Sequence, residues 1–350
     1  MLRRGLPFIL LIALALTACQ KPAAPTPTPQ EDTSSSAEAP STTEKKTVEP
    51  IRLPMGYIPN VQYAPFYLAH QRGYFRDAGF EVEFDYSFET DGIALVGAGE
   101  IPFAVVSGEQ VLLARAQGLP VVYVMTWWQK FPVAVVADAK LGLESPADLK
   151  GQTIALPGLF GANYIGLMAL LYQFDLQETD VTLESIGFNQ VEAFAAGKQR
   201  IVVGYVTNEP IQLRHMGFDL TVFPVADYVT LASNGIVTSE MYLKAHPDRV
   251  RAFVSALLMG LRDAIDHPDS AYEVSREYVE DLAENDPVQQ EVLATALEYW
   301  YSDDLGYIQP EAWQNMHDVL LKMGLLEAPL DVNQAFTNDY LPEWAKGWRK

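Results

Sequence analysis

Short runs of β-branched and aromatic residues alternate with helix-like patterns along much of the chain, from about residue 51 to residue 216. Each run is four to six residues long, and the segments between them repeat apolar residues every three or four positions. Alternation of this kind predicts parallel sheets with helices on their faces, an α/β fold class. The predicted strands are Ile51–Met55, Glu81–Tyr86, Phe103–Val106, Val121–Thr126, Val133–Ala137, Thr153–Leu156, Val181–Ser185 and Ile201–Tyr205. The predicted helices are Tyr63–Arg72, Gly92–Gly97, Gln110–Gln117, Asn163–Phe174, Gln190–Ala196 and Glu209–Met216.

After about Ser239 the pattern becomes mostly helical. The predicted helices there are Pro247–Asp266, Ser270–Asn285, Pro287–Tyr299 and Pro310–Met323. Proline at a first helical position is common, because its missing N–H would have no partner there. We expect this C-terminal helical layer to pack back on the α/β body.

The amino terminus carries a targeting pattern. Arg3 and Arg4 precede an apolar run that ends at Ala18, which is shorter than the ~20 residues that span a bilayer. Residues 1–18 therefore read as a secretory signal peptide. The run closes on Leu-Thr-Ala-Cys, which resembles the bacterial lipobox, and the resemblance implies that Cys19 is the lipidated first mature residue; the alternative is a free cysteine that happens to follow a signal peptide.

The next segment, up to about Pro50, consists largely of Pro, Thr, Ser, Ala and Glu without aromatic residues. Such a composition buries too little apolar surface to offset the entropy of ordering, so residues 19–50 are predicted to be a lipidated cysteine and a disordered tether. We expect a protein anchored by lipid to the extracytoplasmic face of the cell membrane, with a soluble mature body.

Charge and cysteine content exclude several classes of function. The 350 residues carry a net charge of −21, and residues 1–50 hold five basic and five acidic residues, so the acidity belongs to the remainder. An acidic body argues against a nucleic-acid partner and against docking on anionic lipid through a basic patch. A single cysteine excludes disulfides within the chain and the usual structural zinc sites, and the five histidines show no metal-ligand spacing. We therefore expect no metal and no cofactor.

Ligands of open α/β sheets bind beyond the carboxyl ends of the strands, where the following helices begin. This rule selects five junctions, at residues 57–67, 88–92, 107–110, 157–164 and 205–210, together with the strand end that carries Trp127 and Trp128. Adjacent strand residues point to opposite faces, so at most one of these two indoles is expected to line the cleft. Phe160, between two glycines, suggests a flexible loop close to a ligand or a plain loop.

Several polar residues at these junctions also have a purely structural explanation. Ser107 and Asp91 fit helix caps, as does Asn60. Glu109 and Glu209 would gain stability at helix N-termini from the helix dipole alone.

No junction contains Lys or Arg, whereas a site for sulfonate, nitrate or phosphate normally uses a cation. Helix N-termini alone can hold anions, so the shortage disfavours an anionic ligand without excluding one. Aromatic rings stack on flat ligands and amides or carboxylates bind their polar edges, which favours a neutral or weakly cationic heteroaromatic ligand, with or without hydroxyl groups. The motifs GxSxG, GxxxxGK[ST] and HExxH are absent, so we expect no enzyme.

The order of these motifs resembles the extracytoplasmic solute-binding proteins of the sulfonate and thiamine-precursor type. The resemblance rests on the opening at residues 57–69, the Arg-Gly-Tyr-Phe at 72–75, the Ser-Gly-Glu-Gln at 107–110, the Asp-Leu-Lys-Gly at 148–151 and the Asn-Glu-Pro at 208–210. It covers nearly all of residues 51–330, and it looks closest to members that bind riboflavin or thiamine-precursor pyrimidines.

The resemblance implies a type II periplasmic-binding-protein fold: two α/β lobes around a central cleft, with a helical C-terminal layer. Lobe I would contain residues 51–137 and 232–350, and lobe II residues 138–231. The protein would capture riboflavin, or alternatively an aminopyrimidine precursor of thiamine or a sulfonate-type solute, and deliver it to an ABC permease. The related fungal pyrimidine-synthesising enzymes use a cysteine-rich motif that this chain lacks, which makes an enzyme acting on pyrimidine-like compounds the lesser alternative. Carried over residue by residue, the candidate ligand contacts are Asn60, Gln62, Tyr63, Asp91, Ser107, Glu109, Tyr164, Tyr205 and Asn208, to which the aromatic argument adds Trp127, Trp128 and Phe160.

Overall fold

The computed structural model describes residues 48–349. The predicted signal peptide, Cys19 and the tether up to residue 47 lie outside the described residues. Residues 49–50, which we assigned to the tether, begin the first strand instead. Within the described part of the chain, no helix has the length and apolar character needed to cross a membrane.

The described strands form three sheets. One sheet pairs β1 with β2, the second has the order β3-β10-β4, and the third has the order β7-β6-β8-β5-β9. The strands are β1 (Glu49–Gly56), β2 (Phe80–Phe88), β3 (Ala104–Val106), β4 (Val121–Thr126), β5 (Val133–Asp138), β6 (Thr153–Leu156), β7 (Thr182–Ser185), β8 (Ile201–Tyr205), β9 (Leu220–Pro224) and β10 (Gly235–Ser239).

The expectation of purely parallel sheets is wrong. Pairing is parallel between β1 and β2 and between β6 and both of its neighbours, but β5 runs antiparallel to β8 and β9. The strand β10, which we did not predict, runs antiparallel to both β3 and β4. An antiparallel strand can arrive from a distant part of the chain, so local strand–helix alternation gives no signal for it.

The helices follow the predicted pattern closely. The described α-helices are α1 (Ala64–Gln71), α2 (Tyr74–Asp77), α3 (Glu89–Ala98), α4 (Gly108–Ala116), α5 (Gly161–Gln173), α6 (Gln190–Ala195), α7 (Glu209–His215), α8 (Glu240–Ala245), α9 (Pro247–Asp266), α10 (Pro268–Ser275), α11 (Pro287–Trp300) and α12 (Pro310–Lys322). The helix predicted to reach Asn285 ends at Ser275, and turns follow it. Asp281 in that stretch has φ 60°, a left-handed conformation that a continuous helix cannot contain.

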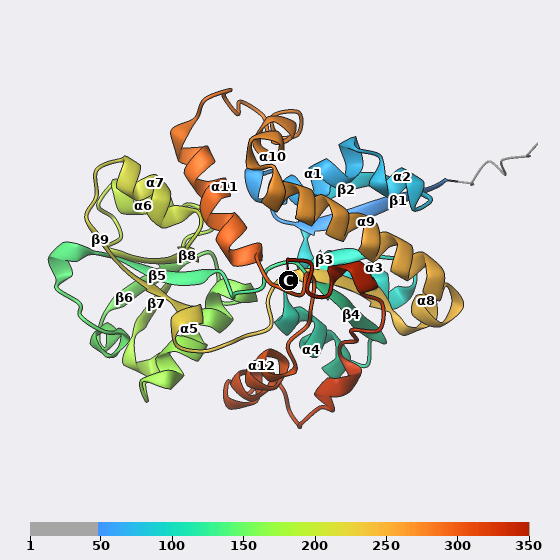
Figure 1. Cartoon of the computed structure of the whole chain (residues 1–350). Helices are drawn as coiled ribbons and strands as arrows, with labels where there is room; N and C mark the ends of the chain where they lie inside the picture. Colours follow the sequence, from blue (N-terminus) through green and yellow to red (C-terminus); the bar gives the residue numbers. More distant parts are fainter. Residues whose placement is uncertain (1–47, 350) are drawn as a thin grey trace, which may run out of the picture. The chain divides into compact units, whose positions relative to one another are not determined.

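The five-stranded sheet is covered on both faces. Along β5, Val133 and Val135 pack in one apolar cluster with residues of α5, whereas Val136 packs with Phe194 of α6 and Leu213 of α7. Successive strand residues point to opposite faces, so α5 lies on one side of the sheet and α6 and α7 on the other (Figure 1). This explains why β5 is almost continuously apolar.

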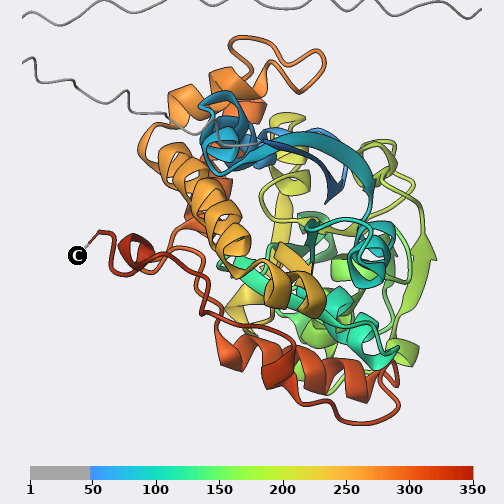
Figure 2. The ribbon, with the colours of Figure 1, turned by 90° about the vertical axis from the view of Figure 1, so that its right-hand side faces the viewer.

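The C-terminal helices pack on the body, as predicted. Helix α9 lies along α1 (Figure 2), and α12 contacts α4 and α5. The approach of α9 to α1 depends on Gly260, where an added Cβ would lie 2.1 Å from the carbonyl oxygen of Pro65. Only a residue without a side chain fits there.

Strand pairing alters one predicted lobe boundary. We placed Val133–Ala137 in lobe I, but β5 pairs with β8 and β9 and belongs to the five-stranded sheet. The described residues cluster as one compact unit, so the division into two lobes remains a proposal, with lobe II beginning near residue 133 rather than 138.

Candidate functional site

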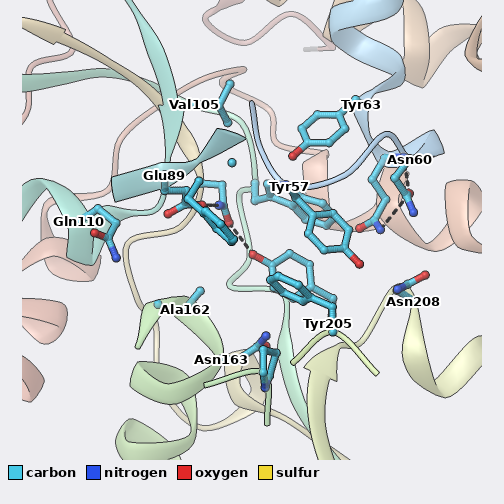
Figure 3. Close-up of a pocket in the computed structure, with 18 of the residues that line it drawn as sticks. Tyr57, Asn60, Tyr63, Glu89, Val105, Gln110, Ala162, Asn163, Tyr205 and Asn208 are labelled. Atoms are coloured by element: carbon cyan, nitrogen blue, oxygen red, sulfur yellow. Dashed lines mark hydrogen bonds between the residues drawn. The ribbon is translucent and has the colours of Figure 1, made fainter. Parts of the chain in front are cut away.

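A cavity of about 430 Å³ opens where several strands of the second and third sheets end. Its volume lies in the range of ~300–1,000 Å³ that is usual for small-molecule sites. Figure 3 shows Glu89 and Gln110 on one side of this cavity, and Asn60 and Asn208 on the other. The lining residues are Gly56, Tyr57, Asn60, Gln62, Tyr63, Phe88, Glu89, Thr90, Val105, Gln110, Trp127, Trp128, Pro157, Phe160, Gly161, Ala162, Asn163, Phe188, Gln190, Tyr205, Asn208, Glu209 and Asn234.

Aromatic rings make up much of the wall. Tyr63 and Trp127 are stacked, with ring centroids 5.3 Å apart and an interplanar angle of 28°. Trp128 meets Tyr205 edge to face at 5.9 Å. These side chains are mostly or wholly buried, so they form a rigid surface on which a flat ligand can stack.

Three phenylalanines at the cavity remain largely exposed: Phe88, Phe160 and Phe188. Phe160 is 61% exposed, and an added Cβ at Gly158 would lie 2.3 Å from its ring, so the ring rests directly over that glycine. Exposed rings beside an apolar cavity are positioned to be covered when a ligand binds.

Hydrogen bonds hold three amide groups of the site in place. Asn60 caps the turn at residues 61–63, where its side-chain oxygen accepts hydrogen bonds from the backbone N–H and the side-chain amide of Gln62. Gln62 in turn accepts a hydrogen bond of 2.9 Å from the hydroxyl of Thr207, which follows β8 of the five-stranded sheet. Asn208 accepts one from Gln212 at 2.9 Å. These bonds fix the amides before any ligand arrives.

Two carboxyl groups reach the cavity wall. Glu89, at the start of α3, accepts hydrogen bonds from the Ser107 backbone N–H and from Asn234 Nδ2, both at 3.0 Å. Glu209, at the start of α7, accepts one of 2.7 Å from the Tyr205 backbone N–H. Burial raises the pKa of Glu89 above its ordinary value and the pKa of Glu209 to about 7.

The position of Glu209 depends on a neighbouring glycine. A Cβ at Gly204 would lie 2.4 Å from the Glu209 carboxyl group, so a larger residue there would displace it. None of the described residues that line the cavity is Lys, Arg or His. The carboxyl and amide oxygens of the wall can accept hydrogen bonds from a ligand.

Two buried polar atoms of the lining lack a hydrogen-bond partner within the described protein. They are the indole nitrogen of Trp127, which is a donor, and the side-chain oxygen of Asn163, which is an acceptor. A buried polar group without a partner is costly to the fold.

Most of the predicted contacts come together at this cavity. The structure places eight in its lining: Asn60, Gln62, Tyr63, Trp127, Trp128, Phe160, Tyr205 and Asn208. The expectation that only one of the two indoles lines the cleft is wrong. Both follow the end of β4, and both backbone N–H groups donate to the carbonyl oxygen of Asn234, so strand alternation does not apply to them.

Four predicted contacts lie outside the lining. Asp91 is exposed, because α3 begins at Glu89 and turns the third residue of the helix toward solvent. Ser107 and Glu109 lie buried behind Glu89. The hydroxyl of Tyr164 points to Glu178, to which it donates a hydrogen bond of 2.9 Å.

Sequence reasoning did not select several lining residues. Glu89 and Tyr57 lie in the junctions that we had identified, but we chose their neighbours. Asn234 immediately precedes the unpredicted strand β10, and Phe188 and Gln190 follow β7. The general rule that sites lie after strand ends would have found Phe188 and Gln190.

The described residues contain no group of three or more His, Cys, Asp or Glu side chains arranged to hold a metal ion.

Comparison with known proteins identifies the family of the chain. Residues 60–271 match the family described as NMT1/THI5 like. The chain is 42% identical over 342 residues to the riboflavin-binding protein RibY of Chloroflexus aurantiacus, covering 95% of this chain and 96% of that protein. It is 28% identical to the formylaminopyrimidine-binding protein of Halalkalibacterium halodurans, covering 87% of this chain and 94% of that protein.

A solved structure shares the fold at low sequence identity. The CA3427 gene product of Candida albicans, described as having the generic periplasmic binding protein fold, matches with a TM-score of 0.62 and 17% identity over 83% of this chain and 97% of that one. The predicted fold class is thus confirmed. Because the family model matches more than half of the chain, the chain belongs to the NMT1/THI5-like family, and it has the periplasmic-binding-protein fold.

Proposed function

We propose that this chain is the lipid-anchored, extracytoplasmic solute-binding protein of an ABC importer, and that it captures riboflavin and delivers it to the permease. The observation that carries the proposal is the cavity wall, which combines aromatic rings, amides and two carboxyl groups without a cation among its described residues. The similarity to a riboflavin-binding protein over nearly the whole chain supports the same ligand.

The chemistry of riboflavin suits the two parts of this wall. Its flat tricyclic ring offers a large face for stacking on rings such as Trp128 and Phe160. Its ribityl hydroxyl groups are hydrogen-bond donors, which suits acceptors such as Glu89 and Asn208. The unpartnered indole N–H of Trp127 is a donor that suits a flavin carbonyl oxygen.

A thiamine-precursor aminopyrimidine is the second candidate. An aminopyrimidine presents neighbouring donor and acceptor atoms that one buried carboxyl group can bind, and Glu209 is such a group. The similarity to a formylaminopyrimidine-binding protein supports this alternative. A single pyrimidine ring would leave much of a cavity of about 430 Å³ unfilled, which favours the flavin.

Lipid anchoring and delivery to a permease rest on the sequence. Cys19 ends a signal-peptide pattern and precedes a segment with the composition of a tether. Expressed in a bacterium with its own signal peptide, the native chain should appear in the membrane fraction, whereas Cys19→Ser should be released. Release of both would refute the anchor.

The deciding experiment titrates the purified protein with riboflavin and, separately, with aminopyrimidines. We expect saturable binding of one riboflavin per chain, with quenching of flavin fluorescence by the neighbouring indoles. Absence of riboflavin binding up to high micromolar concentration, together with tight binding of an aminopyrimidine, would replace the first ligand by the second. Mass analysis of riboflavin recovered after incubation should find it unchanged, because we propose a binding protein and not an enzyme.

A further inference from the structure

Glu89 at the cavity wall and two buried side chains behind it, Ser107 and Glu109, have too few hydrogen atoms for the contacts that they make. Ser107 Oγ lies 2.5 Å from Glu89 Oε2 and also 2.5 Å from Glu109 Oε1. A hydroxyl group has a single hydrogen, so it can donate in only one of these two contacts. The second short oxygen–oxygen contact needs a hydrogen that only a protonated carboxyl group can supply. The pair of carboxyl groups therefore holds one proton.

The remaining hydrogen bonds decide which carboxyl group holds it. Glu89 accepts bonds from the Ser107 N–H and from Asn234 Nδ2, each at 3.0 Å, and the Ser107 hydroxyl is a third donor. Three donors stabilise a carboxylate. Glu109 is fully buried, and its Oε2 has no partner among the described residues. A buried carboxylate with one oxygen that accepts no hydrogen bond is more costly than a neutral acid, so we assign the proton to Glu109 rather than to Glu89.

No cation relieves this arrangement. The other titratable groups that face the pair are Tyr123 on β4, Tyr205 on β8 and, toward Glu89, Tyr63. Burial raises the pKa of all three phenols, so they stay neutral. Among the described Lys, Arg and His residues, none lines the cavity or forms a recorded hydrogen bond with either carboxyl group.

We propose that Glu109 is a positioning residue: it keeps its proton, donates a hydrogen bond to Ser107, and so leaves Glu89 as the anionic acceptor for hydrogen-bond donors of the ligand. In this arrangement the Glu109 carboxyl group donates a hydrogen bond to Ser107 Oγ, and the Ser107 hydroxyl donates one to Glu89. From the other side, the Tyr205 hydroxyl donates to Asn234 at 3.1 Å, and Asn234 Nδ2 donates to Glu89. Glu89 and Asn234 line the cavity, whereas Glu109 does not. The identity of the ligand rests on the proposed function, but the location of the proton does not.

This arrangement predicts weaker binding at alkaline pH. Burial, followed by repulsion from Glu89, raises the pKa of Glu109 to about 8. Above that value, two carboxylates would compete for one hydroxyl hydrogen, and their repulsion would displace Glu89 from the cavity wall. A ligand that donates hydrogen bonds to Glu89 then loses its acceptor.

The first test observes the proton directly in the ligand-free protein. Infrared difference spectra between the native protein and Glu109→Gln at about pH 6 to 7 should contain the carbonyl band of an un-ionised carboxylic acid. Glu209→Gln is the matched control, because it removes a different buried carboxyl group of the site and should leave the Glu109 band in place. Absence of a band that disappears in Glu109→Gln would overturn the proposal.

The second test uses ligand affinity, with each variant normalised to its own value at about pH 7. The riboflavin affinity of the native protein should fall about threefold or more between about pH 7 and pH 9, whereas Glu109→Gln, whose amide donates to Ser107 but cannot ionise, should lack this fall. Glu109→Leu, which has no donor, should bind more weakly than Glu109→Gln. An equal alkaline loss in the native protein and in Glu109→Gln would refute the positioning role. If riboflavin does not bind but the infrared band behaves as predicted, the proposed ligand fails while the proton assignment stands.

Discussion

Replacing Phe160 by alanine separates ligand binding from stability more cleanly than truncating a buried ring of the aromatic wall. The buried rings of Tyr63 and Trp127 support the fold as well as the cavity, so truncating them costs stability. Phe160 is 61% exposed and its loss removes little buried area, so the free energy of unfolding should change by at most about 0.5 kcal/mol.

The expected loss of affinity follows from the exposed area. A phenylalanine side chain of about 200 Å² that is 61% exposed leaves about 120 Å² in water. A flat ligand covers about half of that area, and at about 25 cal/mol per Å² this contributes about 1.5 kcal/mol, or roughly tenfold in Kd.

The assay is calorimetric titration of riboflavin into native protein, Phe160→Ala and Leu159→Ala. Leu159 is the matched control, because it is the adjacent residue, is 50% exposed and does not line the cavity. Thermal unfolding of each ligand-free variant checks that the fold is intact. Equal losses of affinity in the two variants, or none in Phe160→Ala, would refute the assignment of Phe160 to the ligand.

Three further changes test other parts of the structure. Gly158→Ala places a Cβ where the Phe160 ring now rests, so it should lower riboflavin affinity, and the double variant with Phe160→Ala should lose less than the sum of the two single effects. Gly260→Ala forces α9 away from the carbonyl of Pro65 and should cost about 1–3 kcal/mol in the free energy of unfolding, seen as a lower urea midpoint; an unchanged midpoint would contradict the close packing. Because burial raises the pKa of Glu209 from 4.5 to about 7, the native state binds its proton more tightly than the unfolded chain, and stability falls as the pH rises across that interval. Glu209→Gln should remove this part of the fall in urea midpoints, and an undiminished fall would exclude Glu209 as its source.

The sequence predicts those strands and helices whose formation depends on residues close together in the chain. The bounds of β4, β6 and β8 and the whole of α9 agree with the sequence pattern, since the apolar period and the prolines mark them. The sequence pattern did not predict the strand β10, because its partners lie more than a hundred residues earlier and no local feature indicates the pairing.

The sequence predicts which strand-to-helix junctions lie at the cavity, but it does not predict every side chain that lines it. Choosing Asp91 rather than Glu89 depended on placing the start of α3 three residues too late, and that error moves a side chain from the cavity to solvent. Asn234 could not be found at all, since its role depends on the long-range pairing of β10. The agreement for Tyr205 and Asn208 reflects a strand end and a helix start that coincide with the pattern.

The central strand of the β3-β10-β4 sheet has a consequence for the order of folding. The five-stranded sheet is built from one continuous stretch, residues 133–224, whereas β3 and β4 must wait for residues 235–239 to be synthesised before their shared partner exists. Such distant pairing closes a long loop, which slows folding relative to local contacts. A nascent chain that ends before β10 would therefore hold an incomplete β3-β10-β4 sheet and would lack Asn234, the residue that bonds both Glu89 and Tyr205. The binding site is thus incomplete until β10 has been synthesised.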